Sequence, residues 1–270
     1  MRMLESSSVL MIGKMSKHKH FHAKKRYSQH FLTDKRIAKK IADCADIEGA
    51  HVIEIGAGKG FLTKVISRHA AFVYAVELDR ELIPILEALR LSNVKIINDD
   101  FLQCDLEKYK KPVIIGNIPY SITSQIIEKL AIQKGAFKRA VLTIQKEYAE
   151  RLLAKPGTAQ YGPLSLFARY YFSVKKKFSI SARYFSPTPK ISSVVIELTD
   201  RKKPFSVQDE RSFFKMIQGI FCYRRKYIKN ALVHYLHMLP HGIDSALLKK
   251  RPGDLTLYDY QTVYNRICSR

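Results

Sequence analysis

The chain is poor in the features that mark exported or membrane proteins. It has four cysteines, none with the paired spacing of a zinc site or a redox motif: Cys44, Cys104, Cys222 and Cys268. No apolar run approaches the length of a membrane-spanning helix. Residues 8–12 are apolar but too few for a secretory signal, and Glu5 stands where such a signal is positively charged. We therefore expect reduced thiols, no export signal and a cytoplasmic location.

Acidic residues are also scarce. Lys and Arg number 47 and Asp and Glu 24, which gives a formal net charge of +23 and a pI near 9.8. This charge favours a polyanionic partner, and nucleic acid is the first candidate. An anionic membrane is the second, but no isolated basic amphipathic helix stands out, so we expect no membrane partner. A length of 270 residues suits one large domain and one small one, and we expect a monomer.

The basic character begins in an N-terminal arm. Residues 17–26 are a charge run without apolar periodicity, which ends in Lys24, Lys25 and Arg26. We predict a flexible basic arm over residues 1–26 that contacts nucleic acid. Histidines alternate within it, but they lack acidic or cysteine partners, so we interpret them as part of a solvated tail and expect no metal site.

A glycine-rich turn follows the first strand-like segment, residues 52–55. Gly56 and Gly58 let the backbone approach a ligand closely, and a helix predicted to run to about residue 69 adds positive potential at its start. Glu77 ends the second predicted strand, about 20 residues on, where Rossmann-like folds place the carboxylate that binds ribose hydroxyls. The pattern indicates an adenosine-type ligand without distinguishing a dinucleotide from S-adenosylmethionine.

Two further strands end in polar residues. After residues 94–97, Asp100 is placed to accept from an adenine amine while Phe101 lines the ring, although Asp in this position also caps helices and forms turns. After residues 113–115, Asn117 offers a side-chain carbonyl and Pro119 fixes the adjoining backbone. Tyr120 would stack on a base. The competing interpretation of this last stretch is a simple turn.

The order of these segments predicts an α/β fold. Four parallel strands alternate with helices, including one predicted over residues 80–90, and each strand ends in a polar candidate at the same edge of the sheet. Beyond them we predict a strand at 140–144, a helix at 164–172, and a closing hairpin that pairs 178–180 with 194–198. The predicted Rossmann-like domain spans residues 27–200.

Residues 201–270 have helical periodicity and predict a small all-helical domain. Its helices are expected over 210–221, 223–236, 243–249 and 256–268. Arg224, Arg225 and Lys226 are predicted at a helix start, where they could grip phosphates without reading sequence. A solvated helix face is the alternative for any single cation. We expect this domain to dock a nucleic acid.

The motifs taken in order resemble the rRNA adenine N6-dimethyltransferase family, most closely its small-subunit rRNA branch. The resemblance covers roughly residues 24–270 and rests on the motifs at 29–32, 54–58, 77–79, 100, 117–120, 145–147, 185–190 and 224–226. It implies a domain that binds S-adenosyl-L-methionine, and dimethylation of N6 of two adjacent adenosines in the 3′-terminal hairpin of small-subunit rRNA during ribosome biogenesis. Ser28 stands where the family usually has Gly, and His30 where bacterial members usually have Asn.

The resemblance also implies roles for single residues. His30, Leu32, Gly56, Gly58, Glu77, Leu78, Asp100 and Phe101 would form the cofactor site. Asn117 would lie between cofactor and target amine, with Pro119 and Tyr120 beside it and the ring of Tyr120 against a flipped adenine. The cations at 24–26 and 224–226 would contact rRNA in an assembling subunit.

Three alternatives remain at this point. A macrolide-resistance methyltransferase that modifies large-subunit rRNA is related, but residues 251–256 resemble the small-subunit branch. A catalytically silent RNA-binding assembly factor has no physical need for Glu77, Asp100 and Asn117 together. A nicotinamide-dependent enzyme would need a hydride-transfer acid or base, and none stands out near Asn117.

Overall fold

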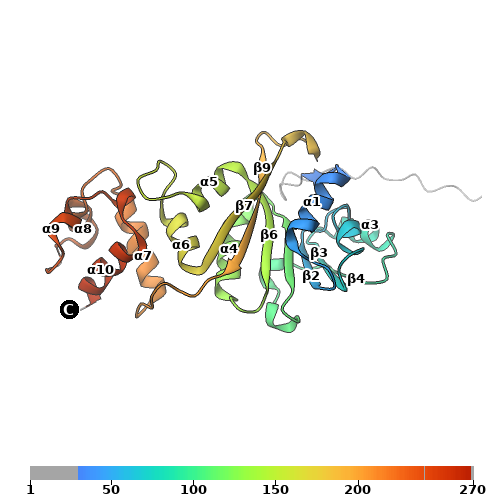
Figure 1. Cartoon of the computed structure of the whole chain (residues 1–270), viewed down its shortest axis with the longest axis horizontal. Coiled ribbons are helices and arrows are strands. Elements are labelled where there is room, and N and C mark those ends of the chain that lie inside the picture. The colour runs from blue at the N-terminus through green and yellow to red at the C-terminus, as the bar shows by residue number, and fades with distance from the viewer. Residues whose placement is uncertain (1–29, 240, 269–270) are drawn as a thin grey trace, which may run out of the picture.

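A seven-stranded sheet forms the centre of the molecule. The computed structural model describes residues 30–239 and 241–268 (Figure 1). Five strands are parallel, and β9 pairs antiparallel with both β6 and β7. In sheet order the strands are β4 (Val94–Ile97), β3 (Phe72–Val76), β2 (His51–Ile55), β5 (Val113–Asn117), β6 (Arg139–Gln145), β9 (Ser193–Asp200) and β7 (Phe172–Ile180). This arrangement confirms the predicted Rossmann-like α/β fold.

The strand order places a ligand crevice at one position. The chain runs outward from β2 to β3 and β4 and then returns to the other side of β2 as β5, where Ile55 lies opposite Gly116. Such a switch point opens a crevice at the carboxyl ends of the strands. The glycine turn after β2 and Asn117 at the end of β5 therefore lie on the two sides of one crevice.

Helices cover both faces of the sheet, because its strands are apolar on both sides. Ile53 and Ile114 point into a core with α4 and α6, whereas Val52 and Val113 point into a second core with α1. The helices of this domain are α1 (Lys35–Ala45), α2 (Thr63–Ile66), α3 (Ile83–Glu87), α4 (Thr123–Ile132), α5 (Lys146–Leu153) and α6 (Pro163–Tyr171). The short strands β1 (Phe31–Leu32) and β8 (Phe185–Ser186) pair separately.

Two helices that flank the sheet are shorter than predicted. The helix expected to run to residue 69 is reduced to α2, which begins only after a turn in which Gly60 has φ +75°. The helix expected over 80–90 splits into a 3-10 turn, η2 (Arg80–Leu82), and α3, with Pro84 in the first turn of α3. Proline has no N–H to donate to the preceding turn and is tolerated in the first turn of a helix, so α3 begins as a new helix around Pro84.

Four helices form the C-terminal part: α7 (Glu210–Phe221), α8 (Ile228–Leu236), α9 (Ser245–Leu248) and α10 (Leu257–Cys268). Figure 1 shows them at one end of the molecule, next to α6. Their buried side chains belong to the same core as those of α4, α6 and the sheet. The helical part is thus packed onto its neighbour through a continuous apolar core.

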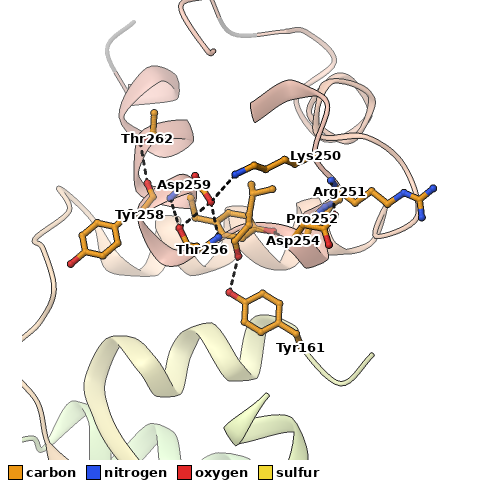
Figure 2. Close-up of polar contacts among 11 residues, drawn as sticks. Tyr161, Lys250, Arg251, Pro252, Asp254, Thr256, Tyr258, Asp259 and Thr262 are labelled. Atoms are coloured by element: carbon orange, nitrogen blue, oxygen red, sulfur yellow. Dashed lines mark hydrogen bonds and ion pairs between the residues drawn. The ribbon is translucent and has the colours of Figure 1, made fainter. Parts of the chain in front are cut away.

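Polar contacts fix the seam between the two parts. The Tyr161 hydroxyl donates to the Leu255 carbonyl at 2.8 Å (Figure 2), and the Gly157 N–H donates to the Gly253 carbonyl at 2.8 Å. At the start of α10, the Asp259 carboxylate accepts from the N–H and the hydroxyl of Thr256. These bonds anchor residues 251–259 between the helices and the loop before α6.

Candidate active site

A cavity of about 300 Å³ lies at the carboxyl ends of β2, β3 and β5. It brings together most of the residues singled out from sequence: His30, Gly56, Gly58, Glu77, Leu78, Asp100, Phe101, Asn117, Pro119 and Tyr120. Phe31, which the sequence did not single out, lines it as well. Residues separated by 90 positions in the chain therefore face one space.

The glycine turn narrows one wall of the cavity. Gly56 and Gly58 have φ angles of +69° and +60°, which residues other than glycine rarely adopt. A Cβ on Gly58 would approach the Phe31 ring to 3.0 Å. The turn therefore presents main chain to a ligand at a point where no side chain fits.

Glu77 supplies a fixed carboxylate to this wall. It is 7% exposed, and its two oxygens accept from the N–H groups of Gly58 and Asp79, each at 2.8 Å. Burial raises its pKa, and the hydrogen bonds from Asp79 and Gly58 oppose that rise. The main chain thus fixes both carboxylate oxygens beside the cavity, with lone pairs left to accept from hydroxyl groups.

Asp100 caps a short helical turn and also lines the cavity. Its Oδ1 accepts from the Leu102 N–H at 2.9 Å and caps the 3-10 turn η3 (Phe101–Gln103). The residue also lines the cavity, next to the buried ring of Phe101. Capping fixes the carboxylate at the end of β4 without using its second oxygen.

Asn117 is held so that its acceptor atom is available. Its Nδ2 donates to the His30 carbonyl at 2.7 Å. Because a carbonyl can only accept a hydrogen bond, this contact fixes which end of the amide faces His30. The Oδ1 atom is not used in it. The Ile118 N–H donates to the Thr143 carbonyl at 3.0 Å and anchors the loop to β6. The amide is oriented before any ligand arrives.

The Tyr120 ring is also held in place. Its hydroxyl lies 3.3 Å from Ser193 Oγ, and its ring stacks on His30 with centroids 5.5 Å apart. His30 Nδ1 lies 2.7 Å from the Pro187 carbonyl. Ser193 is thus a supporting residue that sequence reasoning missed, and Pro187 belongs to the motif at 185–190, to which no place in the site was assigned.

Glu54 is a buried carboxyl group next to the site. It is 1% exposed, its Oε2 has no hydrogen-bond partner among the described residues, and burial raises its pKa to about 8, with the charge of Glu77 adding to the rise. It lines a second cavity of about 410 Å³, which shares Gly56, Gly58 and Asn117 with the first. The sequence showed Glu54 in a motif but gave no reason to expect an unpaired oxygen.

Some candidates lie elsewhere. The Leu32 side chain is buried in the core with α1, and the neighbouring Phe31 faces the cavity instead. Lys24, Lys25 and Arg26 lie outside the described residues. In the part of the chain that is described, no helix is long and apolar enough to cross a membrane, and no His, Cys, Asp or Glu cluster could hold a metal ion.

The three C-terminal cations occupy a turn rather than the predicted helix start. Arg224, Arg225 and Lys226 lie between α7 and α8, because α8 begins only at Ile228. All three are exposed. Arg224 donates to the Thr158 carbonyl at 2.9 Å, which ties the turn to the loop before α6.

Comparison with known proteins identifies the fold and the family. The structure is similar to a dimethyladenosine transferase from Plasmodium falciparum, with a TM-score of 0.76 and 24% identity over 89% of this chain and 98% of that one. It is also similar to the 23S rRNA methyltransferase ErmE, with a TM-score of 0.67 and 24% identity over 88% and 99% of the two chains. Both likenesses describe the fold.

Sequence similarity goes further. The ribosomal RNA small subunit methyltransferase A of Mesomycoplasma hyopneumoniae is 39% identical over 215 residues, which cover 79% of this chain and 83% of that protein. The protein of the same name from Streptococcus thermophilus is 40% identical over 248 residues, 85% and 86% of the two chains. The family described as ribosomal RNA adenine dimethylase matches residues 20–263. This chain therefore belongs to the ribosomal RNA adenine dimethylase family.

Proposed function

We propose that this enzyme transfers methyl groups from S-adenosyl-L-methionine to N6 of two adjacent adenosines in the 3′-terminal hairpin of small-subunit rRNA. The observation that carries the proposal is the Asn117 amide, whose Nδ2 is bound to the His30 carbonyl and whose Oδ1 is left to accept. Its neighbour Tyr120 supplies an aromatic face in the same cavity. An adenine amine with a stacked ring needs these two features together.

The residues of the cavity fit the cofactor. The glycine turn, where a Cβ on Gly58 would crowd the Phe31 ring, leaves main chain open to a ligand. The buried Glu77 carboxylate beside it suits ribose hydroxyls. Asp100 and Phe101 suit the adenine ring, and His30 and Gly56 the amino-acid end. The side chain of Leu32 supports β1 from the core, so we assign its cofactor contact to the main chain. Bound S-adenosyl-L-methionine supplies an electrophilic methyl group.

The chain's own groups then place the nucleophile. The Asn117 Oδ1 and the Ile118 carbonyl, next to Pro119, accept the two N–H hydrogens of the target amine and direct its lone pair. Tyr120 stacks on the base, which has left the RNA stack. Methyl transfer would be an in-line attack by the amine nitrogen on the sulfonium methyl carbon, with the carbon–sulfur bond breaking and the thioether leaving, so placement does most of the catalysis. The nitrogen loses its proton readily after it becomes cationic, and no strong general base is required.

The choice of RNA lies outside the cavity. We assign RNA docking to the basic arm, with Lys24, Lys25 and Arg26, and to the turn at Arg224, Arg225 and Lys226. The net charge of +23 supports a polyanionic substrate. The partner in this proposal is small-subunit rRNA within an assembling subunit. The enzyme is a cytoplasmic monomer. It has two domains, with the boundary near residue 200.

Methyl transfer to isolated subunits tests the proposal. Purified protein and radiolabelled S-adenosyl-L-methionine are incubated with small subunits from a strain that lacks the modification, and with mature large subunits. We expect label at two adjacent adenosines of small-subunit rRNA, each in the dimethyl form. Label on large-subunit rRNA would favour the macrolide-resistance alternative. Tight RNA binding without any label would favour a silent assembly factor.

A further inference from the structure

A third pocket lies in the helical part. It has a volume of about 260 Å³ and opens between the start of α8 and the end of α9. Tyr227, Lys229 and Asn230 line one side, and Ser245, Leu248 and Lys249 line the other. It shares no residue with the Asn117 cavity, and neither the resemblance nor the comparisons assign a role to it.

The pocket is cationic, and its charge is not neutralised locally. Residues 223–251 contain seven Lys and Arg and a single acidic residue, Asp244. The Asp244 Oδ1 accepts from the Ala246 N–H at 2.6 Å as the cap of α9. Among the described residues, the side chains of Lys229 and Lys249 have no ion-pair or hydrogen-bond partner. Both ammonium groups are therefore available to a ligand with negative charge.

Tyr227 gives the pocket an aromatic wall. Its side chain is 54% exposed, although the residue sits on a backbone fixed by the adjacent bond from the Ile228 N–H to the Lys250 carbonyl at 2.8 Å. No other described ring stacks on it, whereas the nearby Tyr223 stacks on His234 with centroids 5.0 Å apart. A single exposed tyrosine is ordinary on a protein surface. An exposed ring and two unpaired lysines that line one pocket form the kind of site that binds single-stranded nucleic acid.

We propose that this pocket binds one unpaired nucleotide of the rRNA substrate, with the base against Tyr227 and the phosphate between Lys229 and Lys249. Asn230 supplies a donor and an acceptor for a base edge or a ribose hydroxyl. The proposal rests on the proposed function for the identity of the RNA. It adds a stacking contact to the phosphate contacts of the preceding turn, and stacking requires that the nucleotide be single-stranded.

Variants that separate stacking from charge test the pocket. Tyr227→Ala should raise the KM for immature small subunits about tenfold with kcat unchanged, and Tyr227→Phe should restore it, because base stacking needs only the ring. Lys229→Gln combined with Lys249→Gln should raise KM several-fold and lower the salt dependence of binding. Tyr258→Ala and Lys215→Gln are matched controls, since both side chains are exposed on the same helical part away from the pocket.

Direct binding and cross-linking keep the result independent of the methylation assay. Small subunits that carry 4-thiouridine in their rRNA are cross-linked to the wild-type enzyme, and cross-linked peptides are identified by mass spectrometry. A cross-link from rRNA to residues 227–230 supports the proposal even if methyl transfer occurs at other adenosines. rRNA cross-links to the enzyme that leave residues 227–230 unlabelled, or pocket variants with the KM and dissociation constant of the controls, would overturn it.

Discussion

The Asn117 cavity and the surface around α8 present polar groups in opposite ways. At the cavity, Glu77, Asp100 and Asn117 are each bound to main-chain groups before any ligand arrives. At the surface, Arg225 and Lys229 are exposed, and their side chains have no partner among the described residues. The cavity therefore fixes the positions of its polar groups, whereas the surface around α8 offers exposed positive charge. Variants in the first should change kcat or cofactor affinity, and variants in the second should change RNA affinity.

The largest effect is expected at Asn117. Asn117→Ala removes the oriented acceptor, so kcat should fall by on the order of 100-fold or more, while cofactor affinity changes little. Single-turnover transfer and calorimetric binding measure the two quantities. Asn93→Ala is the control, because that amide also donates to main-chain carbonyls, of Ser67 and Ala70, but lies outside the cavity. A near wild-type rate in Asn117→Ala would mean that the acceptor role is wrong.

Glu77 should affect cofactor affinity rather than transfer. Glu77→Gln replaces one carboxylate oxygen by an NH₂ group that faces the N–H of Gly58 or Asp79. Loss of a charged acceptor should weaken cofactor binding about 10- to 100-fold. Isothermal titration measures this, and kcat at saturating cofactor should stay within a few-fold of wild type. Unchanged affinity would remove Glu77 from the cofactor site.

Arg225 tests the other side of the comparison. Arg225→Ala should weaken rRNA binding a few-fold and reduce the slope of log K against log salt by about 1, with kcat unchanged. Arg224→Ala should do the same and also lower thermal stability, because Arg224 donates to Thr158 across the seam. Filter binding over a salt series, together with thermal unfolding, separates the two variants. A fall in kcat for Arg225→Ala would contradict the expectation that variants at this surface change only RNA affinity.

Glu54 differs from the other polar groups near the cavity, because one of its oxygens has no partner among the described residues. Its substitution should have the smallest effect on methyl transfer. Its pKa is about 8 in the folded protein and near 4.5 when unfolded, so the folded state binds more protons between these values. The contribution of Glu54 to stability should therefore be fully present below pH 4.5 and be lost as pH rises through 8, by a few kcal/mol at most. Glu54→Gln should remove this decline. Thermal unfolding across the pH series measures it, and an unchanged slope would show that Glu54 is not the group responsible.

The sequence predicts much of the cavity because its residues follow strands in a parallel sheet. Gly56, Glu77, Asp100 and Asn117 each lie at the end of a strand or within three residues after it, and the topology brings strand ends together. What holds them was not predictable. The contacts of His30 with Pro187 and Tyr120 join segments about 90 or more positions apart, and no local pattern encodes such contacts.

The helical part shows a different limit. Helix periodicity located α7, α8 and α10, but it placed residues 224–226 inside a helix and gave no sign of the pocket at Tyr227. Charge is visible in a sequence, whereas a cavity depends on how α8 and α9 pack. The partner class was thus predictable from composition, and the stacking contact was not.

The continuous core between the sheet and α7–α10 has a consequence for the reaction proposed above, which has two target adenosines. Because helices and sheet share their buried side chains, the core holds the turn at 224–226 in place relative to Asn117. The two neighbouring nucleotides cannot occupy the cavity together, so the RNA must move by one nucleotide past a rigid protein. Each such step requires the docking contacts to release and re-form. Exposed cations that exchange quickly with solvent allow this movement, and buried ion pairs would prevent it.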